Sequence, residues 1–127
     1  MERIGVLFVD DDVNLLWSMR RLMHKRPEWD VVFAHDGAHA LDLMLTHDIR
    51  VVVTDISMPG MDGEQLVRRL FQDYPTVMPI VLSGAWDKVA ALRHLGPYIQ
   101  FLSKPVPEKD LLAAMETAVG YARLAAA

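Results

Sequence analysis

Five short apolar segments alternate along the chain with longer segments in which apolar residues recur at helical spacing. The short segments are continuously apolar, which is typical of strands that are buried on both faces of a sheet. Each ends in polar or loop-forming residues, so its boundaries are clear. The pattern predicts strands over residues 4–9, 30–34, 51–54, 78–83 and 98–102.

Each predicted strand is followed by a segment with the apolar periodicity of an amphipathic helix. The first helix ends before Pro27, the third begins at Asp62 or Gly63, the fourth runs from about Trp86 to His94, and the last spans residues 110–123. The residues expected to face inward are Leu15, Leu16, Met19, Leu22 and Met23, then Ala40, Leu41, Met44 and Leu45, then Leu66, Val67, Leu70 and Phe71, then Val89, Ala90 and Leu92, and finally Leu111, Leu112, Met115, Ala118, Val119 and Ala122.

A strand–helix unit repeated five times predicts an α/β fold with a parallel sheet, helices on both faces and right-handed connections. For five units the expected arrangement is a flavodoxin-like, doubly wound sheet of order 2-1-3-4-5. In that order the ligand crevice lies between the carboxyl ends of the first and third strands. We expect one domain over residues 1–124, with a ragged C-terminal end at 125–127.

Composition narrows the class of protein further. The 127 residues are 52% hydrophobic and 24% charged, which is the balance of a soluble globular domain. A net charge of -4 argues against a nucleic-acid surface, and there is no apolar stretch of membrane-spanning length and no signal peptide. There is no cysteine, hence no disulfide and no thiol nucleophile. These features predict a cytoplasmic protein.

Carboxylates stand at the ends of two of the predicted strands. Asp10 and Asp11 follow the first strand, and Asp55 ends the third. Because these strands are neighbours in the expected order, the three side chains converge. Carboxylates roughly 5 Å apart, at an effective dielectric constant of about 20, repel one another by about 3 kcal/mol per pair, so the cluster needs a cation. Mg²⁺, a hard ion that prefers oxygen ligands and keeps open positions for water and phosphate, suits the site.

Two further groups end the fourth and fifth strands. Ser83 supplies a hydroxyl, Lys104 supplies a mobile positive charge, and Gly84 leaves room for an incoming group. Three carboxylates, one Mg²⁺ and one lysine have a net charge of about zero, which favours binding of a phosphoryl group. The set predicts phosphoryl transfer to a carboxylate, with Asp55 at its centre.

In this order, the acidic pair Asp10-Asp11, Asp55 with the loop 58–63 (Met-Pro-Gly-Met-Asp-Gly), Ser83 and the pair Lys104-Pro105 resemble the receiver domain of bacterial two-component response regulators. The resemblance covers essentially the whole chain. It implies that Asp55 is the phosphoacceptor. It also implies that Asp11, Asp55 and the backbone carbonyl of Ser57 ligate Mg²⁺, with Asp10 acting through water.

The resemblance further implies a conformational switch made of Ser83 and Phe101, with a cis bond between Lys104 and Pro105. The switch would alter the surface of the fourth helix, fifth strand and last helix, where a partner, an output domain or a second copy would bind. The phosphoryl donor would be a histidine kinase or a phosphotransfer protein. The chain would not be an enzyme beyond its own phosphorylation and dephosphorylation. Its segment 82–105 is similar to that of receivers that precede HD-type (HDOD) output domains.

Three positions depart from or vary within this family. Ser57 and Ala85 occupy sites at which the family tunes dephosphorylation, and both are small. Phe101 stands where some members carry tyrosine, so its ring has no hydroxyl to form a hydrogen bond.

Two other functions remain open at the level of the sequence. The chain could be a pseudo-receiver, in which the same fold binds a partner without phosphorylation. It could also be a haloacid-dehalogenase-like phosphatase with Asp10 as nucleophile, since residues 10–12 offer the Asp-x-Asp pattern. Against the phosphatase, Asn14 stands where that pattern expects Thr or Val, and no cap domain fits in 127 residues.

Several other polar residues have simpler interpretations. Asp12 and Asp62 are expected to cap helices rather than bind metal. The five histidines are scattered and do not predict a zinc site. Trp86 fits a partner-facing and a packing role equally well. Met58 and Met61 lie in the loop after Asp55 and are not expected to belong to the core.

Overall fold

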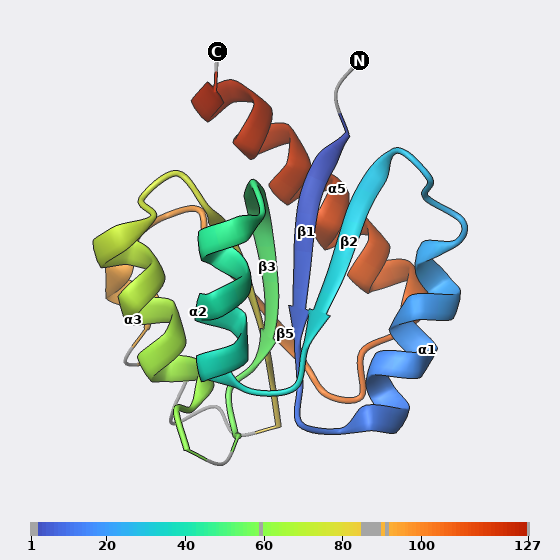
Figure 1. Ribbon diagram of the computed structural model, residues 1–127, viewed down its shortest axis with the longest axis horizontal. Helices are drawn as coiled ribbons and strands as arrows, with labels where there is room; N and C mark the ends of the chain where they lie inside the picture. The colour runs from blue at the N-terminus through green and yellow to red at the C-terminus, as the bar shows by residue number, and fades with distance from the viewer. Residues whose placement is uncertain (1–2, 59, 85–89, 91, 127) are drawn as a thin grey trace.

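A computed structural model of the chain describes residues 3–58, 60–84, 90 and 92–126. Its centre is a five-stranded sheet in the order β2-β1-β3-β4-β5, with every neighbouring pair parallel (Figure 1). This is the predicted flavodoxin-like order. The strands are β1 (Ile4–Val9), β2 (Trp29–Ala34), β3 (Ile49–Asp55), β4 (Met78–Ser83) and β5 (Gln100–Ser103).

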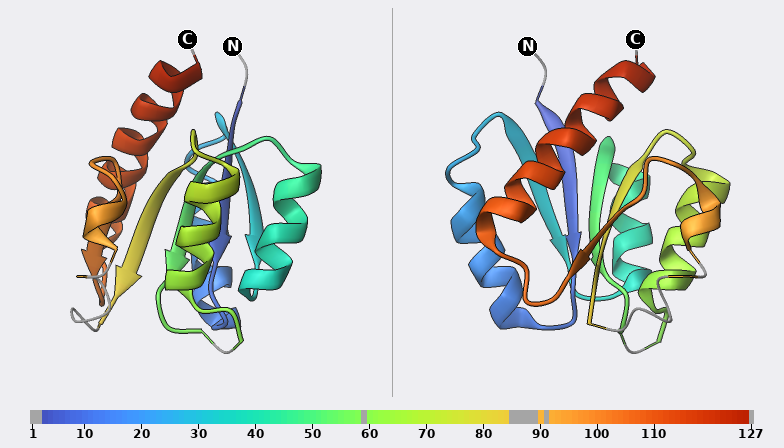
Figure 2. Two further views of the ribbon diagram at one scale, coloured as in Figure 1. Left: turned by 90° about the vertical axis from the view of Figure 1, so that its left-hand side faces the viewer. Right: turned by 180° about the vertical axis from the view of Figure 1, so that it is seen from behind.

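Helices cover both faces of this sheet, as the alternating pattern predicted. Figures 1 and 2 show α1 and α5 on one face and α2 and α3 on the other. Within the described residues, no helix is both long and apolar enough to span a membrane. The helices are α1 (Val13–Met23), α2 (Gly37–Thr46), α3 (Gly63–Asp73), the short 3₁₀ helix η1 (Arg93–Leu95) and α5 (Glu108–Ala126).

The core forms two layers because successive strand residues point to opposite faces. Phe8 and Val53 pack with α1 and α5, whereas Leu7 and Val52 pack with α2 and α3. A third cluster packs near the β4–β5 edge: Ile56, Val67, Val81, Leu92 and Ile99.

Carboxylate side chains cap the N-termini of three helices: Asp12 caps α1, Asp36 caps α2 and Asp62 caps α3. Asp12 accepts hydrogen bonds from the backbone N–H groups of Asn14 and Leu15, which confirms its predicted role. Asp62 and Gln65 form a reciprocal capping box at the start of α3, so Asp62 is likewise a cap. Of the three consecutive acids at 10–12, Asp12 therefore caps α1, and only Asp10 and Asp11 remain as candidates for a site.

Some element boundaries differ from those expected. β3 begins two residues earlier, at Ile49, because Ile49 pairs with Gly5 of β1. β5 begins at Gln100, where pairing with Ile80 starts. α5 begins at Glu108 and remains helical through Ala126. Most of the predicted helix from Trp86 to His94 lies outside the described residues, as do Pro59, Ala85, Trp86 and Val89.

Three predicted core assignments are wrong. Ala90 is exposed, although it was expected to face inward. Leu45 is 77% exposed, because Ala40 and Met44 occupy the side of α2 that faces the sheet and Leu45 lies beyond it. Met58 is only 8% exposed, although it lies in the loop after Asp55. Met58 packs with the α2–α3 layer and Met61 packs partly against it, so this loop is anchored by its own apolar side chains.

Candidate functional site

Three carboxylates meet at the carboxyl ends of β1 and β3. Val9 of β1 pairs with Thr54 of β3, so the residues that follow, Asp10 and Asp55, lie side by side. The side chains of Asp10, Asp11 and Asp55 each offer an oxygen within 4.8 Å of the others. The convergence predicted from strand order is therefore present. Asp10 and Asp55 are buried and Asp11 is exposed, so the cluster opens to solvent on one side.

Lys104 reaches this cluster from the end of β5. Its Nζ lies 3.1 Å from Oδ1 of Asp55 and 3.8 Å from Oδ2 of Asp10. The backbone N–H of Lys104 donates to the carbonyl of Ser83 at 3.0 Å, which ties the end of β5 to the end of β4. The bond between Lys104 and Pro105 is cis, as the resemblance implied.

Asp10 has the most perturbed environment in the cluster. Burial raises the pKa of its carboxyl group above the ordinary value; a hydrogen bond from the backbone N–H of Asp12 and the charge of Lys104 oppose this, and Asp55 and Asp11 reinforce it. Its Oδ2 is buried and has no hydrogen-bond partner among the described residues. A buried carboxylate oxygen without a donor is costly unless a cation or proton accompanies it.

The other predicted site residues, Ser83, Phe101 and Ser57, lie at or near the carboxyl ends of β4, β5 and β3. Ser83 is buried at the end of β4, and a Cβ built on Gly84 would meet nothing within 4 Å, so there is room beside it. Phe101 is half-buried on β5, paired with Val81. Ser57 is exposed just past the end of β3. The structure thus brings the carboxylates and Lys104 into contact range and places Ser83 on the adjoining strand end.

The carboxylate cluster fits a hard divalent cation. Three carboxylates and one lysine leave a local charge of -2, and oxygen ligands of this kind suit Mg²⁺. Oδ2 of Asp10, which accepts no hydrogen bond within the described residues, is a further observation that favours a cation there. In the described parts of the chain, no other group of three or more His, Asp or Glu side chains converges in this way.

Two residues near the site had no assigned role at the level of the sequence. A Cβ built on Gly63 would lie 2.2 Å from the carbonyl oxygen of Asp55, so only glycine allows α3 to start this close to the acid. The sequence carried one signal for this close approach, namely a glycine directly after the capping residue Asp62. The guanidinium of Arg93 lies over the ring of Phe101, 4.9 Å from its centroid. No sequence signal could have found this contact, because it depends on where η1 packs.

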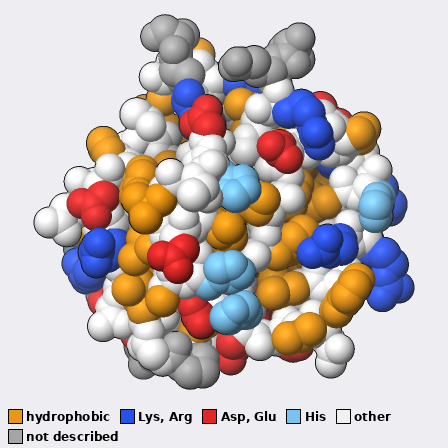
Figure 3. Space-filling model, viewed as in Figure 1, with side chains coloured by type: hydrophobic (Ala, Val, Ile, Leu, Met, Phe, Trp, Pro, Cys, Tyr) orange, Lys and Arg blue, Asp and Glu red, His pale blue; other side chains and the backbone are white. Residues whose placement is uncertain are grey.

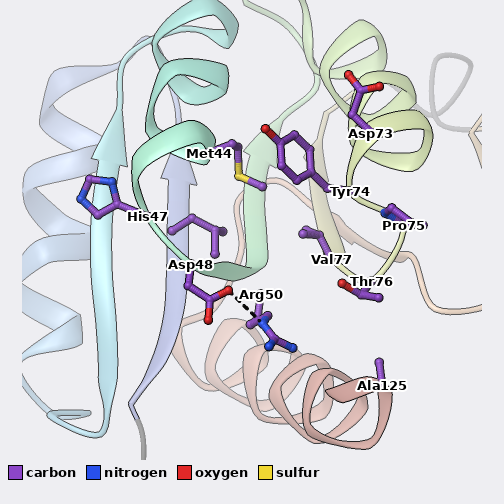
Figure 4. Close-up of a pocket in the computed structure, with 11 residues that line it drawn as sticks. Met44, His47, Asp48, Arg50, Asp73, Tyr74, Pro75, Thr76, Val77 and Ala125 are labelled. Carbon is purple, nitrogen blue, oxygen red and sulfur yellow. Dashed lines mark hydrogen bonds and ion pairs between the residues drawn. The ribbon is translucent and has the colours of Figure 1, made fainter. Parts of the chain in front are cut away.

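A separate hollow of about 440 Å³ lies at the opposite end of the sheet, beside the start of β3. Figure 4 shows the side chains that line it, including Met44 and Tyr74, with an ion pair of 3.2 Å between Asp48 and Arg50. None of the predicted site residues lines this hollow. The carboxylate cluster is the better candidate for chemistry because charged groups converge there.

The surface carries charges of both signs. On the face shown in Figure 3, acidic and basic side chains are interspersed with hydrophobic ones. His35 and His39 are in ring contact, with centroids 4.6 Å apart, and His35 also pairs with Asp36.

A five-stranded doubly wound sheet with an acidic cluster at the ends of β1 and β3, and a lysine beside it, defines a receiver-type domain. The chain belongs to the response regulator receiver domain family, whose model matches residues 6–116. Membership of this family makes the chain a component of two-component, phosphorelay signal transduction.

Bacterial relatives agree with this membership. The chain is 29% identical over 122 residues to the DNA-binding transcriptional regulator NtrC of Escherichia coli, covering 95% of this chain and 26% of the relative. It is 34% identical over 121 residues to the C4-dicarboxylate transport transcriptional regulatory protein DctD of Pseudomonas aeruginosa, covering 94% of this chain and 26% of the relative. The chain thus spans about a quarter of the length of these relatives.

Solved structures also resemble it. The signal receiver domain of an HD domain-containing protein from Pseudomonas fluorescens Pf-5 superposes with a TM-score of 0.88 at 30% identity, covering 96% of this chain and 98% of that one. A CheY-like receiver domain protein from Methanospirillum hungatei superposes with a TM-score of 0.87, covering 96% and 98% of the two chains. Its identity is 21%, so this second likeness concerns the fold alone.

Proposed function

We propose that Asp55 is the phosphoacceptor of this receiver and that its phosphorylation switches a binding surface. One observation carries the proposal: Nζ of Lys104 lies 3.1 Å from Oδ1 of Asp55, within a cluster that also contains Asp10 and Asp11. A lysine beside the acceptor can neutralise an oxygen of an incoming phosphoryl group. Positioning and charge neutralisation are most of what phosphoryl transfer requires of a protein.

The proposed step is an in-line displacement at phosphorus. A carboxylate oxygen of Asp55 forms a bond to phosphorus while the bond from phosphorus to the donor's leaving atom breaks, and the leaving group takes that electron pair. With acetyl phosphate the leaving group is acetate; with a phosphohistidine donor it is the imidazole of a histidine kinase or a phosphotransfer protein. The chain would catalyse only this step and the later hydrolysis of its own aspartyl phosphate.

We assign the magnesium site to the same cluster. Asp11, Asp55 and the backbone carbonyl of Ser57 would hold Mg²⁺, with Asp10 acting through water. When bound, the ion supplies positive charge that offsets the charge of the phosphoryl oxygens. The converging carboxylates support this assignment, as does the buried oxygen of Asp10 that accepts no hydrogen bond within the described residues.

The proposed switch joins Ser83 and Phe101. A phosphoryl group on Asp55 would draw the hydroxyl of Ser83 toward it, and Phe101 would turn into the space that this movement opens. The surface formed by the predicted fourth helix, β5 and α5 would then change its affinity for an output domain, a partner protein or a second copy. Small differences in contact energy are sufficient to shift such a two-state equilibrium.

The proposed context is the cytoplasm of a bacterium, with residues 1–124 as the receiver domain and 125–127 as its C-terminal end. The 30% identical structure belongs to an HD domain-containing protein, which supports an HD-type output domain. NtrC and DctD are transcriptional regulators, so regulation of transcription is the competing output. In either case we propose that the receiver itself contacts neither nucleic acid nor membrane.

Intact-mass measurement tests the acceptor. With acetyl phosphate and Mg²⁺, the wild-type chain should gain one phosphoryl group, and chelation of Mg²⁺ should prevent this. Asp55→Asn should gain none, whereas Asp42→Asn, a matched change at an exposed acid on α2, should behave as wild type. Equal phosphorylation of Asp55→Asn would refute the assignment.

The same sample separates the alternatives. A pseudo-receiver would bind its partner equally well with and without donor and Mg²⁺. A phosphatase using Asp10 would turn over an aryl phosphate continuously, and its activity would survive in Asp55→Asn. The match to the response regulator receiver family supports neither the pseudo-receiver nor the phosphatase over the phosphoacceptor.

A further inference from the structure

We infer that Arg93 is a positioning residue for the switch: its guanidinium lies over the ring of Phe101, holds the ring in this orientation and so limits the population in which the ring has turned. This inference rests on the function proposed above, in which Phe101 turns inward when Asp55 is phosphorylated. It assigns a role to a residue outside the carboxylate site.

The contact itself is specific. Cζ of Arg93 lies 4.9 Å from the centroid of the Phe101 ring, within the range at which a cation is attracted to an aromatic face. The ring also packs against the buried cluster that includes Val81 and Leu92. Leu92 is fully buried, and Arg93 follows it directly, so the backbone that carries the guanidinium is anchored.

This contact is connected to the site through β4 and β5. Phe101 pairs with Val81, and Ser103 pairs with Ser83 two residues further along both strands. Since side chains two residues apart lie on the same face of a strand, Phe101 and Ser83 share one face of the sheet. A turn of the ring out of its present orientation would break its contact with the guanidinium of Arg93.

The absence of a ring hydroxyl makes this contact important. Phe101 cannot donate a hydrogen bond in either orientation, so a polar group can favour one orientation only through the face or edge of the ring. The guanidinium of Arg93 is such a group. An exposed cation–π contact corresponds to a factor of about two to five in an equilibrium constant.

Beryllium fluoride with Mg²⁺ is a suitable probe, because it mimics a phosphoryl group on a carboxylate. If it binds the ring-inward state, its apparent Kd falls when that state becomes more populated. Arg93→Gln should therefore bind it about two- to fivefold more tightly than wild type. If Arg93 acted only through its positive charge, Arg93→Gln would instead bind the anionic beryllium fluoride more weakly than wild type.

Three variants make the test specific. Arg93→Lys keeps a cation and should fall between wild type and Arg93→Gln. Arg21→Gln removes a matched exposed charge on α1 and should leave the Kd unchanged. In a Phe101→Leu background, Arg93→Gln should have no effect, because the ring that couples the two residues is gone.

A second readout does not need the analogue. With 4-fluorophenylalanine incorporated, the ¹⁹F resonance of residue 101, assigned by its loss in Phe101→Leu, should shift in Arg93→Gln and not in Arg21→Gln. An unchanged resonance, or equal or weaker binding of beryllium fluoride by Arg93→Gln, overturns the role of Arg93 while the proposed function stands. If wild type binds no beryllium fluoride, the proposed function fails, and the role of Arg93 in a switch fails with it.

Discussion

The α-carbon of Gly63 lies so close to the backbone of Asp55 that a Cβ on Gly63 would be 2.2 Å from the Asp55 carbonyl oxygen. The N–H of Gly63 also donates to the carbonyl of Ile56 at 2.9 Å, which fixes the start of α3 against the end of β3. The loop that follows Asp55 is thus closed at its base by a contact between backbones.

Gly63→Ala should therefore destabilise the protein. The atoms in the way belong to backbone and cannot rotate aside, so β3 or α3 must shift; we expect a loss of about 1–3 kcal/mol in the free energy of unfolding. Chemical denaturation measures it. Gly120→Ala is the matched control, because a Cβ at Gly120 in α5 meets nothing within 4 Å, and it should stabilise by about 0.5–1 kcal/mol. Equal effects of the two changes would contradict the close approach.

Asp10→Asn should stabilise the protein in the presence of a chelator. The change removes repulsion from Asp55 and Asp11, and an asparagine oxygen can still accept the N–H of Asp12. Because Lys104 offsets part of this repulsion, we expect a gain of about 1–2 kcal/mol near neutral pH. A loss of stability in urea melts with EDTA would show that these acids do not repel one another.

The gain from Asp10→Asn should depend on pH in a defined direction. Burial raises the pKa of Asp10 in the folded protein, so the folded state binds this proton more tightly than the unfolded chain does. The free energies of unfolding of wild type and variant should differ least below the unfolded-state pKa of about 3.9. The difference should grow as the pH rises through the folded-state pKa and should then stay constant. A difference that shrinks with rising pH would have the wrong sign.

Mg²⁺ should stabilise the wild type against unfolding. A ligand that binds only the folded state at tenfold excess over its Kd adds about 1.4 kcal/mol. Asp11→Asn should lose most of this gain, because it removes one carboxylate of the cluster. Asp42→Asn should keep it. Thermal melts with and without MgCl₂ report the shift, and an equal shift in all three proteins would place the ion elsewhere.

Met58→Ala should cost far more stability than Leu45→Ala. Met58 is buried against the α2–α3 layer, so truncation leaves a cavity and should cost about 2–3 kcal/mol. Leu45 is mostly exposed, and its truncation should change the free energy of unfolding by less than about 0.5 kcal/mol. The reverse ranking in denaturant melts would mean that the loop after Asp55 is not anchored by Met58.

The sequence by itself determined the strands, their order and the residues that meet at their carboxyl ends. Buried parallel strands are continuously apolar and end abruptly, so Asp10, Asp55, Ser83 and Lys104 could be placed on one edge from local pattern and connection rules. The capping roles of Asp12 and Asp62 could also be predicted, because capping depends on residues only two or three positions away.

Only the tertiary structure decided what the loops and helix flanks contact. Met58 is buried because the α2–α3 layer lies over it, Leu45 is exposed because that layer ends beside it, and Gly63 abuts Asp55 across a turn. Arg93 meets Phe101 because η1 packs beside β5. These contacts join residues through space, and the periodicity of a single element carries no information about what another element places against it.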